Sequence, residues 1–135
     1  MASEGGDDGP TFEILAEESA TTTKNPDNFA ASPTSKNAAV AAALSAKARG
    51  ATLVASQSWG AAVAAYTDAL ISLPVERYLA TTRGVLLTNR ALCYQRLGHW
   101  QLCKDDCDDA LKHDAQSAKA WFRRAQAHRK LNAND

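Results

Sequence analysis

Apolar residues recur every three or four positions from about Ser35 onward, which is the period of an α-helix with one buried face. Turn residues interrupt this pattern at Pro74, in the segment 97–100 (Leu-Gly-His-Trp) and in the segment 114–117 (Asp-Ala-Gln-Ser). The chain is therefore predicted to be all-α, with helices over residues 36–56, 59–72, 78–97, 100–113 and 117–131.

Residues 1–33 lack any sustained period, are rich in Ser, Thr, Gly, Asp and Glu, and contain three of the four prolines. The 15 basic and 15 acidic residues of the chain cancel, but the segment 1–33 holds seven acidic residues and one lysine, so it carries −6 and the remainder +6. We predict a disordered acidic tail over 1–33 and one helical domain over 34–135.

The helical region repeats itself. An offset of 34 aligns Leu87, Ala91 and Tyr94 with Trp121, Ala125 and His128, and an offset of 41 adds two helical turns to the same period. Under the longer offset, Gly50, Leu53, Trp59, Ala62, Tyr66, Ala69 and Leu70 correspond to Ala91, Tyr94, Trp100, Cys103, Cys107, Ala110 and Leu111. Small residues at fixed places of a 34-residue period indicate pairs of closely packed helices.

This pattern resembles the tetratricopeptide repeat. The first repeat has Gly50, Ala62, Tyr66, Ala69 and Pro74 at the signature positions, and the second has Ala91, Tyr94, Gly98 and Ala110. The resemblance implies an antiparallel helix-turn-helix array of about two and a half repeats and five helices, acting as a protein-binding adaptor without enzymatic activity.

In such an array the first helix of each repeat lines a concave groove. The side chains expected there include five basic residues and no acidic one, so the groove is suited to an extended anionic ligand. These basic residues are Lys47, Arg96, Lys119, Arg123 and Arg129.

The groove is similar to that of clamp-type tetratricopeptide domains in co-chaperones, which bind the acidic Glu-Glu-Val-Asp tail of 70-kDa and 90-kDa heat-shock chaperones. Lys47, Asn89, Lys119 and Arg123 match four of the five clamp positions, and Ala51 stands at the fifth in place of Asn. The resemblance therefore implies that these four residues bind the peptide carboxylates. Arg96 and Gln126 would contribute nearby, and the loss of an amide at Ala51 would weaken or retune binding.

Two other functions remain open. The same fold serves as a scaffold for an internal peptide or another protein, without a carboxylate clamp. A thiol- or metal-dependent enzyme is the alternative from another class, because His99, Cys103 and Cys107 lie at steps of four on one helix. Cys103 and Cys107 occupy packing positions of the repeat, so we predict core residues, no metal, no cofactor and no catalytic group.

The remaining features are weaker. The balanced charge gives no reason to expect binding of nucleic acid. No apolar run reaches the roughly 20 residues of a membrane span, so no membrane association is predicted. The acidic N-terminal residues and the three cysteines favour a cytoplasmic location. The run Asp105, Asp106, Asp108 and Asp109 is predicted to be a solvated surface. The last helix exposes a face that predicts self-association, a further domain or a longer protein, and this face holds Trp121, Ala125, Ala127 and Leu131.

Overall fold

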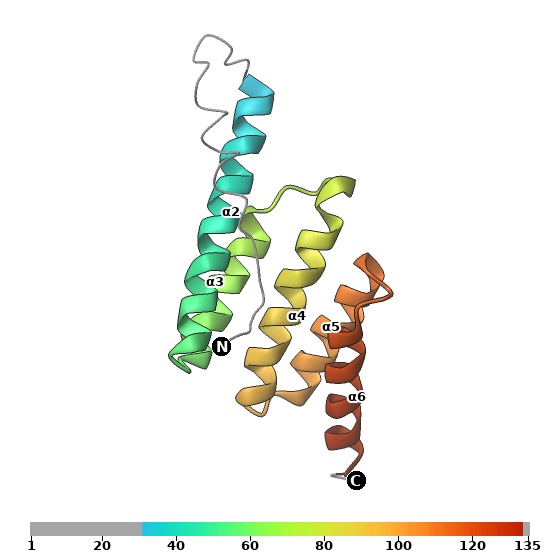
Figure 1. Cartoon of the computed structure of the whole chain (residues 1–135). Coiled ribbons are helices and arrows are strands. Elements are labelled where there is room, and N and C mark those ends of the chain that lie inside the picture. Colours follow the sequence, from blue (N-terminus) through green and yellow to red (C-terminus); the bar gives the residue numbers. More distant parts are fainter. Residues whose placement is uncertain (1–30, 134–135) are drawn as a thin grey trace. The chain divides into compact units, whose positions relative to one another are not determined.

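The structure, a computed structural model, describes residues 31–133, with side chains from Ser35 onward. Its elements are the helices α2 (Ala31–Ala55), α3 (Trp59–Ser72), α4 (Ala80–Arg96), α5 (Trp100–His113) and α6 (Ala118–Ala133), with the 3-10 turn η2 (Arg77–Leu79) before α4 (Figure 1). No strand occurs in this part of the chain, and the all-α prediction is confirmed.

The predicted bounds are close to the observed ones, with two differences. Helix α2 begins at Ala31, within the last three residues of the predicted tail, and α4 begins two residues late because η2 precedes it. The rest of the tail prediction lies outside the described residues. From Ala38 onward the helices form one compact unit, and the first turns of α2 lie outside it.

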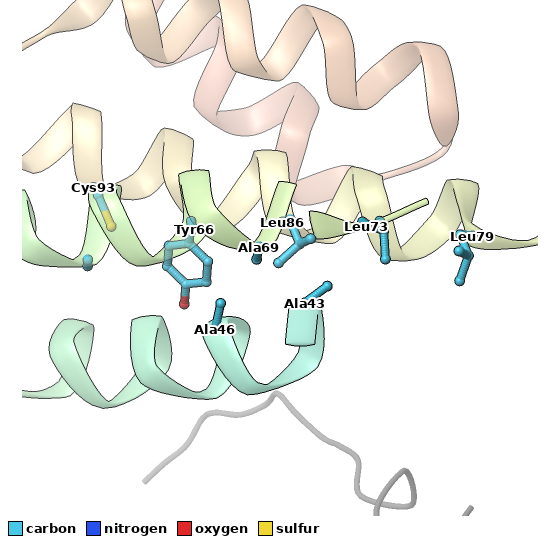
Figure 2. Packing of buried hydrophobic residues seen from close by; sticks show 9 residues of the cluster. Ala43, Ala46, Tyr66, Ala69, Leu73, Leu79, Leu86 and Cys93 are labelled. Carbon is cyan, nitrogen blue, oxygen red and sulfur yellow. The ribbon is translucent and has the colours of Figure 1, made fainter. Parts of the chain in front are cut away.

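The first helix pair packs closely because small residues line the contact. Ala43 and Ala46 of α2 are buried against α3, and Gly50 is so close to Tyr66 that a methyl group there would lie 2.7 Å from the ring atom Cζ. Figure 2 shows the Tyr66 ring extending from α3 toward α2, beside Ala46. Glycine at residue 50 therefore allows the two helix axes to approach.

The second unit repeats this packing with other side chains. Ala91 of α4 occupies the place of Gly50 and is buried with Cys103 and Cys107 of α5, neither of which is exposed. The prediction that both cysteines are core residues is confirmed. Ala127 of α6 belongs to the same cluster, so its predicted exposure is wrong, because this side of α6 packs back onto α5.

Both turns between paired helices have the same backbone. Gln57 and Gly98, 41 residues apart, have φ of 61° and 80°, and the next residue in each turn donates its N–H to a carbonyl at the end of the preceding helix. Those two hydrogen bonds, from Ser58 to Leu53 and from His99 to Tyr94, measure 2.8 and 2.9 Å. A left-handed residue thus ends the first helix of each pair.

A buried ion pair connects α4 and α5. Arg90 donates two hydrogen bonds of 2.7 and 2.8 Å to the carboxylate of Asp106, and a third of 3.0 Å to Thr67 of α3. Burial raises the pKa of Asp106, and Arg90 offsets part of that effect. The prediction of a solvated acidic run is therefore wrong for Asp106, which faces the core.

Residues Ser35–Ala55 of α2, with a mean hydropathy of 1.2, are long and apolar enough to cross a membrane by length and composition alone. This differs from the sequence-based expectation, since alanines raise the mean hydropathy although Lys47 and Arg49 interrupt the segment. One face of the helix is nevertheless packed in the core through Ala43 and Ala46.

Candidate functional site

Asn89 and Lys119, two of the predicted clamp residues, line one cavity between α4 and α6. The cavity has a volume of about 90 Å³, and its wall also contains Gly84, Val85, Thr88, Ala110, Asp114 and Ser117. The first turn of α6 brings Lys119 here, because Ser117 caps that helix by accepting a hydrogen bond of 3.2 Å from the N–H of Ala120. We call Asn89, Lys119 and Arg123 the α4–α6 site.

Asn89 also has a structural partner, which the sequence did not indicate. Its side chain lies close enough to the hydroxyl of Tyr66 to lower the pKa of that group, although burial has the larger effect and raises the pKa to about 12. Asn89 therefore faces α3 as well as the cavity. The Tyr66 ring in turn touches Gly50, which follows Lys47 on α2.

Arg123 lies one helical turn after Lys119 on α6. Its Nη1 is buried and has no hydrogen-bond partner among the described residues. Burial lowers the pKa of this guanidinium, the nearby Arg96 lowers it further, and the thiols of Cys93, Cys103 and Cys107 act in the opposite direction. Within residues 35–133, Arg123 forms no ion pair with a carboxylate.

The other predicted residues do not line this cavity. Lys47 is half-buried on α2, and Ala51, one turn later, is exposed and offers no polar group. Arg96 lies over the Trp59 ring, with its guanidinium carbon 5.5 Å from the centroid. Gln126 of α6 accepts a hydrogen bond of 3.1 Å from Gln95 of α4, and this bond connects the two helices.

One residue of the cavity was missed because it lies in a turn. Asp114 lines the same cavity as Lys119, although the groove was predicted to contain no acidic residue. Its carboxylate accepts the N–H of Gln116 at 3.1 Å, which shapes the turn into α6. The Asp-Ala-Gln-Ser turn in the sequence could have indicated this role, because Asp at a turn commonly accepts a hydrogen bond from the backbone two residues later.

Two solved structures have the same arrangement of helices. The first tetratricopeptide domain of Spaghetti (RPAP3), solved with the HSP90 peptide SRMEEVD, superposes with a TM-score of 0.60 at 28% identity, over 68% of each chain. The tetratricopeptide domain of Arabidopsis OM64 gives a TM-score of 0.63 at 25% identity, over 70% of this chain and 73% of the other.

The described helices have the arrangement of a tetratricopeptide repeat domain. The human sperm-associated antigen 1 is 39% identical over 66 residues, which are 49% of this chain and 7% of that protein, so the chain spans a small part of this relative. No family model matches the sequence. A tetratricopeptide domain is a scaffold for protein–protein interaction, and the repeat and the pairing of helices predicted from the sequence are confirmed.

Proposed function

We propose that this tetratricopeptide domain is a co-chaperone-type adaptor that binds the acidic C-terminal tail of a 70-kDa or 90-kDa heat-shock chaperone. Asn89, Lys119 and Arg123 of the α4–α6 site bind the terminal carboxylates, together with Lys47 of α2. Arg96 and Gln126 flank the peptide. Ala51 supplies no amide, so one carboxylate has one donor fewer than in a complete clamp.

The buried Nη1 of Arg123 is the observation that carries this proposal. A guanidinium partly removed from water without a carboxylate is unfavourable, and a peptide carboxylate bound by the accessible part of this half-buried side chain would offset that cost. Lys119 is exposed one turn before it, and Asn89 shares the cavity with Lys119. Charge-assisted hydrogen bonds from these groups favour a free carboxylate over a neutral amide.

The similarity to the Spaghetti (RPAP3) domain supports the same ligand class, because that domain was solved with a peptide that ends in Glu-Glu-Val-Asp. A cytoplasmic location is part of the proposal. The three buried cysteines Cys93, Cys103 and Cys107 are unpaired thiols, as expected for a protein kept in a reducing compartment.

The test is a titration with a peptide that ends in Glu-Glu-Val-Asp, as the free acid and as the C-terminal amide. We expect the amide to bind at least about tenfold more weakly, since a lost charge-assisted hydrogen bond costs about 1.5 to 3 kcal/mol. Equal binding of the two peptides would indicate recognition of an internal sequence, and absence of binding by both would refute the proposal.

A matched pair of lysine variants locates the site. Lys119→Ala removes a cation that lines the cavity, and Lys112→Ala removes an exposed cation of α5 that pairs with Asp109 at 3.3 Å. Both change the net charge equally. We expect only Lys119→Ala to weaken binding of the free acid strongly, whereas equal weakening would mean that diffuse charge, not a site, attracts the peptide.

A further inference from the structure

The turn between α4 and α5 carries apolar side chains that remain accessible to solvent. Leu97, which ends α4, is 40% exposed, and Leu102, in the first turn of α5, is 46% exposed. His99, between them in the sequence, is exposed as well. Two accessible leucines within six residues give this end of the helices a small apolar surface.

Two cation–π contacts hold basic groups at the same end. The guanidinium carbon of Arg96, in the last turn of α4, lies 5.5 Å from the ring centroid of Trp59, the first residue of α3. Lys130 of α6 lies 5.6 Å from the ring centroid of Trp100, the first residue of α5. Arg96 and Lys130 are 34 residues apart, so both contacts occupy the same place in the repeat. We call Arg96, Leu97, His99, Leu102 and Lys130 the turn edge.

No acidic residue of the described chain balances the charge of the turn edge. Arg96 and Lys130 are exposed, and neither pairs with a carboxylate within residues 35–133. The segments that meet here contain no Asp or Glu, and these are residues 50–67, 87–104 and 115–133. The net charge of zero for the whole chain therefore conceals a local excess of positive charge.

We propose that the turn edge docks on the surface of an anionic membrane. Arg96 and Lys130 lie at the lipid phosphates, and Leu97 and Leu102 enter the boundary between the headgroups and the acyl chains. Cations are attracted to an anionic leaflet, and apolar side chains beside them add buried area. This mode of binding needs no helix that spans the bilayer.

The leucines favour a membrane over a nucleic acid. Phosphates of a nucleic acid would attract Arg96 and Lys130 equally well, but the phosphate backbone offers no apolar partner for Leu97 and Leu102. The sequence gave no reason to expect this surface, because its residues come from separate segments. Only the contacts of Arg96 with Trp59 and of Lys130 with Trp100 bring them together.

Further repeats of the same chain would leave the turn edge accessible. Trp59 and Arg96 belong to a part of the array that α5 and α6 already follow, and Arg96 is nevertheless exposed. The surface is also separate from the proposed clamp, since Leu97, Leu102 and Lys130 take no part in it. Binding of membranes and binding of the Glu-Glu-Val-Asp peptide can therefore fail independently.

The test is sedimentation of the full chain with phosphatidylcholine vesicles, prepared with and without phosphatidylserine. We expect binding only to vesicles that contain phosphatidylserine, and weaker binding as salt is added. Lys130→Ala should lower the affinity about fivefold, the effect of one cation near an anionic leaflet. Lys112→Ala is the matched control, because Lys112 lies at the other end of α5 and pairs with Asp109, and it should leave the affinity nearly unchanged.

A second pair of variants tests the apolar contribution. Leu97→Ser combined with Leu102→Ser should weaken binding at least about tenfold. The control is Val75→Ser, since Val75 is 89% exposed but lies between α3 and η2, away from the turn edge. Circular dichroism and the affinity for the Glu-Glu-Val-Asp free acid verify that each variant keeps its fold and its clamp.

Tryptophan emission gives a measurement that leaves the turn edge unaltered. The chain has three tryptophans, and Trp121→Phe leaves only Trp59 and Trp100, the two that contact the cations of the edge. Vesicles with phosphatidylserine and brominated acyl chains should quench the emission of this variant.

Four outcomes would overturn the inference. Vesicles without phosphatidylserine could bind equally well, or neither kind of vesicle could bind. The double leucine variant could bind as tightly as the original chain, which would indicate a site for any polyanion, such as a nucleic acid. Quenching that is present in the original chain and absent in Trp121→Phe would place the docked surface at the other end of α6.

Discussion

Gly50 of α2 lies directly against the phenol ring of Tyr66 of α3, where an added methyl group would be 2.7 Å from Cζ (Figure 2). The hydroxyl of the same ring lies near the side chain of Asn89, which lowers the pKa of that hydroxyl. One tyrosine thus joins the first helix of the domain to the candidate ligand site. Changes at this contact are expected to affect both stability and binding.

Gly50→Ala should destabilise the fold by about 1 to 3 kcal/mol, because the methyl group must displace a fully packed aromatic ring. The matched control is Gly60→Ala in α3, where an added methyl group meets nothing within 4 Å. That control should be neutral or stabilising by up to about 1 kcal/mol, since alanine favours helix. Urea unfolding of both variants measures the difference, and equal effects would contradict the close contact.

Gln57→Gly should stabilise the domain by about 1 kcal/mol, because a left-handed backbone costs an L-residue about 1 to 2 kcal/mol. Gln57 has φ 61°, and Gly98 occupies the same place in the next unit with φ 80°. The reverse change, Gly98→Ala, should be destabilising by a similar amount. Thermal unfolding followed by circular dichroism tests the pair, and effects of the same sign would be inconsistent with a shared turn.

Asp106→Asn should destabilise the fold by about 3 kcal/mol, since it leaves the Arg90 cation without its counter-charge in the core. The two side chains are only 19% and 7% exposed. Asp105→Asn is the control, because Asp105 is exposed and accepts one hydrogen bond from Gln101. It should change the unfolding free energy by less than about 0.5 kcal/mol in the same urea titration.

Arg123→Met should abolish binding of the carboxylate peptide without lowering stability. The unbound arginine has a buried Nη1 with no partner among the described residues, so an apolar side chain of similar length removes an unfavourable burial. We expect an unfolding free energy equal to or above that of the original protein. A loss of several kcal/mol would mean that Arg123 is a structural residue, and unchanged peptide affinity would remove it from the site.

Stability should fall at alkaline pH because of Tyr66. Its pKa in the folded state is about 12, above the ordinary value of 10.0, so the folded state holds the proton more tightly. The stabilisation is complete below pH 10 and is lost as the pH rises to about 12, by about 2 to 3 kcal/mol for a group that is 2% exposed.

Urea unfolding at a series of pH values measures this loss, and Tyr66→Phe should make the dependence shallower. The Cys93 thiol contributes as well, since burial raises its pKa to about 11, and that part remains in the variant. An identical pH dependence in Tyr66→Phe would assign the effect to other groups.

Repetition made most of the fold predictable. The equivalence of Gly50 with Ala91, and of Tyr66 with Cys107, already indicated which faces pack together, and both pairs are buried. The placement of Lys119 and Arg123 one turn apart on one helix was also readable from the spacing. The start of α2 and the turn η2 were not, because alanine-rich and short irregular segments have weak periodicity.

The sequence by itself determined the repeat, the helix faces and the position of each basic residue, since helical periodicity sets direction within one element. Only the tertiary structure decided what those residues meet across helices: that Asn89 lies near the hydroxyl of Tyr66, that Asp106 is buried with Arg90, that Asp114 lines the cavity and that Arg123 has no counter-charge among the described residues. Such contacts depend on the separation and register of neighbouring helices. Those quantities follow from packing between elements, and no pattern within a single helix contains them.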